Sequence, residues 1–126
     1  MLAARLAAVR RRGVGASAQG ADALIDGLAT IARRAHRAGL RVIGATITPY
    51  GCAEGCFGPE QEATRQTVNT WIRTTSMVDG VADFDAAIRD PANPSQVLPG
   101  YQADHLHPNI AGQHAMADAI DLSLFR

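Results

Sequence analysis

The strongest constraint on the fold is a helical pattern that ends at a glycine and leads directly into a buried apolar run. Over residues 21–38, apolar side chains recur at three- and four-residue steps, with acids early and arginines late, which suits the helix dipole. Gly39 is a natural residue to end this helix, and 40–47 resembles a strand that is buried on both faces. This order is the second half of a βαβ unit. It predicts an α/β fold with a parallel sheet.

The rest of the chain divides into elements that fit this architecture. The predicted elements are a short helix at 2–11, a loop at 13–20, the helix at 21–38, the strand at 40–47, a loop at 48–59, a helix at 59–76, a strand at 81–84, a helical turn at 85–89, a loop at 90–103 and a helix from 108 onward. Two strands make a poor sheet with two open edges. We therefore expect one incomplete domain over 1–126, with an atypical segment at 1–20 and with strands missing from the N-terminal side.

The charge balance and the apolar pattern exclude several classes of partner. The chain carries 12 basic and 12 acidic residues, whereas a protein that binds nucleic acid or an anionic membrane needs a basic face. No apolar run approaches the roughly 20 residues of a membrane span. Arg5 interrupts the only stretch that could serve as an export signal. The cytoplasm is therefore the default location, with secretion expected if an upstream segment is missing.

The two cysteines, Cys52 and Cys56, leave more than one interpretation open. A zinc site usually needs four ligands, and no histidine lies close to them in sequence. A disulfide within the loop and two free thiols are both compatible with the C-x3-C spacing, whereas a redox role would need C-x-x-C. No acidic or histidine cluster has metal-ligand spacing, and no glycine-rich phosphate loop follows a strand. We therefore expect neither a metal nor a cofactor.

The residues best suited to acid-base chemistry are Asp104 and His107, just before the last predicted helix. An aspartate three residues ahead of a His-Pro can place its carboxylate against the imidazole within one turn. Pro108 restricts His107 to an extended backbone, which fixes how its side chain projects. With one ring nitrogen held by Asp104, the other is free to act as a base toward a hydroxyl. The alternative interpretation is a capped helix start, in which Asp104 or Asn109 holds backbone N–H groups.

Four segments give the chain a resemblance to a known family. They are RVIGATITPY at 41–50, VNTWIR at 68–73, VADFD at 81–85 and DHLHPNIAG at 104–112. Together they resemble the SGNH (GDSL-type) hydrolases over about residues 21–125. The resemblance implies a flavodoxin-like three-layer α/β/α sandwich, here truncated at its N-terminal side. It also implies an esterase, lipase or acylhydrolase that acts on small-molecule, lipid or carbohydrate esters, with His107 as general base and Asp104 as its orienting partner.

The nucleophilic half of such a site is not found in this sequence. The family carries its serine in a Gly-Asp-Ser context after the first strand, and no Gly-Asp-Ser occurs here. It takes oxyanion donors from a Gly-x-Asn-Asp segment, whereas this chain reads RGVGAS at 12–17, without an asparagine. Of the four serines, Ser17 has a conceivable strand-end position, while Ser76, Ser95 and Ser123 resemble a helix end, a turn and a terminal helix residue.

Two functions from different classes are consistent with these features. The first is the C-terminal portion of an ester hydrolase that retains the Asp104–His107 part of a triad and has little or no activity alone. The alternative is a catalytically inactive remnant that acts as a binding or oligomeric scaffold, through the sheet edge that the missing strands leave open. The remaining polar residues receive structural interpretations: His36 and His114 at the surface, His105 beside the site, and Asp83 and Asp85 as caps of the turn after the second strand.

Overall fold

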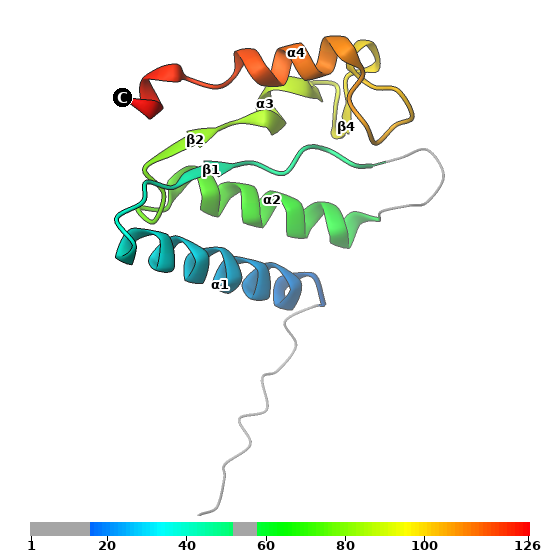
Figure 1. Cartoon of the computed structure of the whole chain (residues 1–126). Coiled ribbons are helices and arrows are strands. Elements are labelled where there is room, and N and C mark those ends of the chain that lie inside the picture. Colours follow the sequence, from blue (N-terminus) through cyan, green and yellow to red (C-terminus); the bar gives the residue numbers. More distant parts are fainter. Residues whose placement is uncertain (1–15, 52–57) are drawn as a thin grey trace, which may run out of the picture.

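The computed structural model describes residues 16–51 and 58–126 of the chain (Figure 1). Its elements, in order, are α1 (Ala16–Arg37), β1 (Ile43–Ala45), α2 (Pro59–Thr74), β2 (Gly80–Ala82), α3 (Phe84–Ile88), β3 (Arg89–Asp90), β4 (Asn93–Val97), the 3-10 turn η1 (Pro99–Tyr101), α4 (Ile110–Asp118) and the 3-10 turn η2 (Leu122–Phe125). The helix predicted at 2–11, the segment up to residue 15 and the two cysteines lie outside the described residues.

The parallel pairing predicted from the sequence is present between β1 and β2. Ile43 pairs with Gly80 and Ala45 with Ala82 in a parallel ladder. In Figure 1, α1 and α2 lie on one side of this strand pair, and α3 and α4 lie on the other. The prediction of an α/β fold is confirmed, because helices and strands alternate from α1 to α3 and β1 is joined to its parallel partner β2 through α2.

A small apolar core joins α1 to α2. Ala21, Val68 and Ile72 are almost completely buried, and Trp71 packs against them half-buried. Complete burial of a valine or isoleucine side chain contributes roughly 1.5 to 3 kcal/mol each. On α1 the fully buried positions are alanines, which allow the helix to approach α2 closely.

Two helix boundaries differ from the sequence prediction. α1 begins at Ala16, so the stretch 16–20 belongs to the helix and not to a loop. The alanines around Gly20 favour a helix strongly enough to tolerate that glycine. The last helix ends at Asp118 and does not continue to Leu124. Leu124 instead packs on Gly80, where a Cβ atom would overlap the leucine side chain.

The predicted loop at 90–103 is wrong, because this stretch contains a β-hairpin. β3 and β4 pair antiparallel, with Arg89 opposite Val97 and Asp90 opposite Asn93. The sequence did not predict this hairpin because the stretch contains prolines, and proline usually argues against a strand. In the part of the chain that the structure describes, Pro94 lies in a two-stranded sheet, so each strand has an unpaired edge where a missing N–H breaks no ladder hydrogen bond.

Candidate active site

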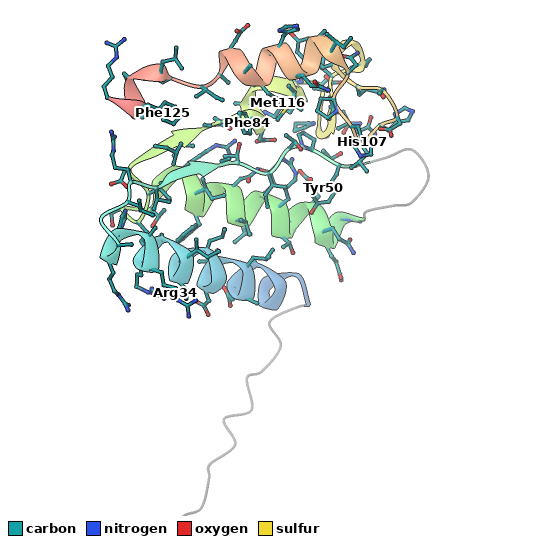
Figure 2. All side chains as sticks on the ribbon, viewed as in Figure 1. Arg34, Tyr50, Phe84, His107, Met116 and Phe125 are labelled. Atoms are coloured by element: carbon teal, nitrogen blue, oxygen red, sulfur yellow. The ribbon has the colours of Figure 1, made fainter. Side chains whose placement is uncertain are left out.

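The loop before α4 places the side chains of Asp104 and His107 in direct contact. His107 Nδ1 lies 2.7 Å from Asp104 Oδ2, while Asp104 Oδ1 accepts hydrogen bonds from the backbone N–H groups of His107 and Leu106 at 2.7 and 3.1 Å. An ionised carboxylate can only accept, so in the neutral imidazole Nδ1 carries the hydrogen and Nε2 has the free lone pair. The His107 and Asp104 side chains are 70% and 56% exposed, so this nitrogen is accessible. Figure 2 shows His107 on the loop beside the start of α4.

Backbone contacts close the loop that carries the pair. Gln102 and Pro108 form an isolated antiparallel bridge, and the N–H of Ala103 donates to the carbonyl of His107 at 2.8 Å. His105 adopts a positive φ of 67°, and its N–H donates to the side chain of Gln102 at 2.7 Å. His105 is exposed and turns the chain between the two members of the pair.

Asn109 connects this loop to α4. Its side-chain amide donates to the carbonyls of Gly100 and Gln102 at 3.0 and 3.3 Å, and its Oδ1 caps the helix by accepting from the N–H of Gly112 at 3.0 Å. Gly112 is buried against the carbonyl of Tyr101, where a Cβ atom would overlap the oxygen. The helix cap and the contact between Asp104 and His107 are therefore present together.

The electrostatics of the loop predict how it responds to acid. Hydrogen bonds from the His107 backbone and side chain lower the pKa of Asp104 to about 2, below its ordinary value of about 3.9. A depressed carboxylate pKa means that its contacts stabilise the loop above the ordinary pKa and are lost as pH falls through about 2. We expect the amide NMR shifts of Leu106 and His107 to titrate with a midpoint near 2, and Asp104→Asn to remove this transition. A midpoint near 4 would contradict the contacts.

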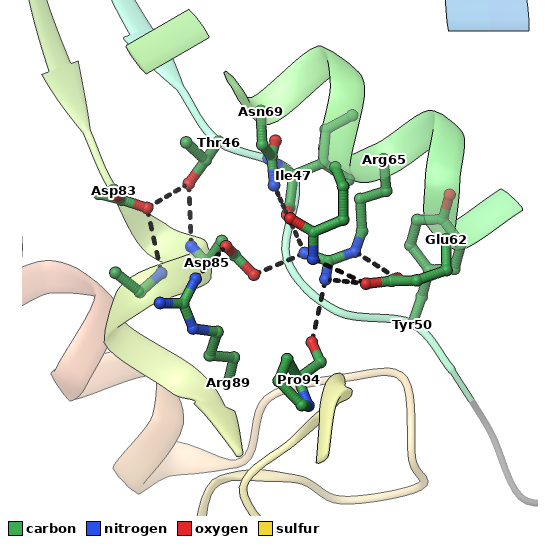
Figure 3. Close-up of polar contacts among 12 residues, drawn as sticks. Thr46, Ile47, Tyr50, Glu62, Arg65, Asn69, Asp83, Asp85, Arg89 and Pro94 are labelled. Carbon is green, nitrogen blue, oxygen red and sulfur yellow. Dashed lines mark hydrogen bonds and ion pairs between the residues drawn. The ribbon is translucent and has the colours of Figure 1, made fainter. Parts of the chain in front are cut away.

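A buried cluster of charged side chains, centred on Asp85, was not predicted from the sequence. The carboxylate of Asp85 has no solvent exposure and contacts three arginines. Arg73 lies 2.7 Å away, and Arg65 and Arg89, which Figure 3 labels beside Asp85, lie at 2.5 and 2.9 Å. Burial by itself would raise the pKa of Asp85, but hydrogen bonds from Arg73 and Arg65 outweigh it and the pKa is lowered. The prediction that Asp85 caps a turn is wrong. Asp83 does cap α3, by accepting from the N–H of Ala86 at 3.0 Å.

Arg65 connects this cluster to the segments around the site. Its guanidinium is fully buried and donates to the carbonyls of Ile47 and Pro94, each at 3.0 Å, while Glu62 binds it on a third side (Figure 3). The segment after β1 is thereby fixed to the hairpin. The burial of Arg65 does have a signal in the sequence. Arg65 lies three and seven residues before Val68 and Ile72, so all three fall on the buried face of α2.

A cavity of about 260 Å³ lies at the C-terminal end of β1, beside the hairpin. Figure 2 shows Tyr50, one of its walls, at the same end of the strands as His107. Ser95 also lines it, but lies on β4 and not in the predicted turn, with its hydroxyl donating to Asn93 at 3.0 Å. The side chain of Ser17 lies outside the described residues. The cavity is lined by Tyr50, Gly51, Gly58, Pro59, Glu62 and Ser95.

Comparison with known proteins agrees with the sequence resemblance. The model of the GDSL-like Lipase/Acylhydrolase family matches residues 6–115, which is most of the chain. A search of curated proteins found no match. Among the described residues, no helix combines the length and the apolar character that crossing a bilayer requires.

Proposed function

Because the chain belongs to the GDSL-like lipase/acylhydrolase family, we propose that it is an ester hydrolase in which His107 is the general base and Asp104 orients it. The observation that supports these roles is the 2.7 Å contact between Asp104 and His107 Nδ1, which leaves Nε2 free and exposed. The proposed substrate is a carboxylic ester of a small molecule, a lipid or a carbohydrate.

The proposed reaction assigns one task to each member of the pair. His107 Nε2 takes the proton of a hydroxyl as its oxygen attacks the ester carbonyl, and later returns it to the leaving alcohol. Asp104 stays ionised and stabilises the imidazolium. The nucleophilic hydroxyl and the oxyanion donors have no assigned residues in this chain. Since members of a triad act as a unit, we expect the 126 residues alone to show little or no catalytic turnover.

The fold proposed with this function is a flavodoxin-like three-layer α/β/α sandwich that is incomplete on its N-terminal side. Its support is the parallel pairing of β1 with β2 and the presence of helices on both sides of the pair. Among the described residues one edge of β1 has no paired strand, and further strands of the sandwich would be added there.

The base role of His107 predicts how the chain reacts with an activated ester. With protein in excess over p-nitrophenyl acetate, the free Nε2 should take a proton from a water molecule as its oxygen attacks the acetyl carbonyl, which releases acetate and p-nitrophenolate; absorbance follows the p-nitrophenolate. We expect His107→Ala to lower this rate several-fold. Asp104→Asn should lower it as well, because the carboxylate no longer stabilises the charged ring.

His114 provides the matched control, since it is an exposed histidine on α4, outside the loop of the acid-base pair. His114→Ala should leave most of the p-nitrophenolate release intact. If His107→Ala reacts as fast as the unaltered chain, the base role of His107 is wrong. Rapid catalytic turnover that depends on His107 would instead show that this chain supplies its own nucleophile.

A second candidate function is a binding or oligomeric scaffold without catalysis. The observation that favours it is an edge of β1 that no strand covers within residues 16–51 and 58–126, next to an apolar groove beside α1.

A further inference from the structure

The loop that carries Asp104 and His107 depends on hydrogen bonds, and not on packing, for its shape. Residues 103–107, here called the acid-base loop, are exposed throughout, so burial contributes little to how the two side chains meet. The arms of the loop join at a neck, where the N–H of Ala103 donates to the carbonyl of His107 at 2.8 Å. Asp104 directly follows Ala103, and His107 is itself part of the neck. The geometry of the neck therefore determines how carboxylate and imidazole meet.

Asn109 ties this neck to α4 through every polar group of its side chain. The amide nitrogen donates to the carbonyls of Gly100 and Gln102 at 3.0 and 3.3 Å, and the amide oxygen accepts from the N–H of Gly112 at 3.0 Å. The backbone N–H of Asn109 also donates to the carbonyl of Tyr101 at 2.9 Å. Asn109 is half-buried and Gly112 is buried, so this residue links the exposed loop to the packed part of the protein.

The helix cap alone does not require an asparagine at this position. Asparagine, aspartate and serine cap helices about equally well, because each offers an oxygen to the free N–H groups of the first turn. Of these three, only asparagine has N–H donors on the same side chain. An aspartate would turn a second oxygen toward the two carbonyls, and a serine would leave both without this donor. The amide nitrogen of Asn109 therefore has a task that is separate from the cap.

We propose that Asn109 is a positioning residue for the acid-base pair. Its amide nitrogen fixes the carbonyls of Gly100 and Gln102, and the neck that adjoins them holds Asp104 against Nδ1 of His107. Asn109 acts on the reaction only through this pair. The consequence for ester hydrolysis rests on the proposed function, whereas the consequence for the contact between Asp104 and His107 does not.

Gln102 carries this restraint into the acid-base loop. Its carbonyl accepts from the Asn109 amide, and its side-chain oxygen accepts from the N–H of His105 at 2.7 Å. His105 has a φ of 67°, a backbone conformation that is uncommon for residues other than glycine. The turn between Asp104 and His107 therefore needs a fixed partner, and Asn109 fixes that partner.

Asn109→Ser separates the two tasks, because it removes the amide donors, keeps an oxygen for the cap and adds no charge. Asp104 reports on the positioning, since hydrogen bonds from His107 and Leu106 lower its pKa to about 2. In the variant we expect these bonds to weaken. The midpoint, followed by the amide NMR shifts of Leu106 and His107, should then move toward the ordinary pKa of about 3.9. The Gly112 amide should stay protected from hydrogen exchange, which would show that the cap is intact.

Asn93→Ser is the matched control, because Asn93 is an exposed asparagine on β4, outside the acid-base loop. It should leave the midpoint near 2, and circular dichroism confirms the fold of each variant. If the serine variant at 109 folds poorly, Asn109→Asp takes its place. The aspartate keeps the shape of the side chain and the cap, turns a carboxylate oxygen toward the two carbonyls, and is judged by the reaction rate.

The reaction with p-nitrophenyl acetate separates positioning from a purely structural role. Asn109→Ser should slow the release of p-nitrophenolate several-fold, about as much as Asp104→Asn. The double variant should be no slower than Asp104→Asn, because Asn109 acts through that carboxylate. A midpoint that stays near 2 in Asn109→Ser overturns the proposal, and so do losses of rate that add in the double variant. If His107→Ala reacts as fast as the unaltered chain, the proposed hydrolysis is wrong, and the midpoint alone decides whether Asn109 positions the pair.

Discussion

Replacing Asp85 with alanine is expected to lower the free energy of unfolding by about 3 to 5 kcal/mol, the usual cost of breaking a buried ion pair by removing one partner. Asp85 has no exposed surface, and its carboxylate compensates Arg65, which is also fully buried. Without the carboxylate, Arg65 keeps Glu62 at 2.7 Å but loses its other charged partner. Most of the cost comes from leaving the buried Arg65 guanidinium with one charged partner instead of two, and not from the lost attraction itself.

Equilibrium unfolding in urea, followed by circular dichroism, measures this effect. Asp22→Ala is the matched control, because Asp22 is an exposed aspartate on α1 and its removal should change stability by less than about 0.5 kcal/mol. Asp85→Asn should fall between the two, since the amide keeps the shape and some hydrogen bonds but not the charge. If Asp85→Ala costs no more than Asp22→Ala, the cluster is hydrated in solution and does not hold the loops.

The Asp104–His107 contact and the buried cluster differ in how far the sequence alone predicts them. Asp104 and His107 are three residues apart in one loop, so a local pattern was sufficient to predict their contact. Arg65 and Asp85 are twenty residues apart on different helices, and only the tertiary structure joins them. Periodicity places Arg65 on the buried face of α2, but it does not identify Asp85 as the partner that compensates its charge.

The secondary-structure elements also divide into those that local sequence predicts and those that depend on distant contacts. β1, α2 and β2 were predicted because their apolar patterns are strong and local. The hairpin of β3 and β4 was missed because its prolines argue against a strand, while its pairing is determined by contacts such as that between Arg65 and the Pro94 carbonyl. The true end of α4 depends on the packing of Leu124 on Gly80, a contact over more than forty residues.

Gly112→Ala is expected to destabilise the protein by about 1 to 3 kcal/mol and to move the loop that carries His107. A Cβ atom at this position would overlap the carbonyl oxygen of Tyr101 and lie 3.0 Å from the Cβ of Pro108. The Tyr101 oxygen cannot withdraw freely, because it accepts the N–H of Asn109 at 2.9 Å. Alanine is favoured over glycine inside a helix by about 1 kcal/mol, but overlap with a fixed backbone atom outweighs this gain.

Gly27→Ala separates these two effects, because Gly27 lies within α1 at a position where an added Cβ atom would meet no neighbouring atom within 4 Å. It should stabilise the protein by about 0.5 to 1 kcal/mol, through helix preference alone. For Gly112→Ala, urea unfolding should show the opposite sign, and the amide NMR signals of Leu106 and His107 should shift while those of α1 stay in place. Should Gly112→Ala stabilise the protein as Gly27→Ala does, α4 and the Tyr101 carbonyl move apart easily, and the loop is not held against α4 as tightly as the Asn109 contacts indicate.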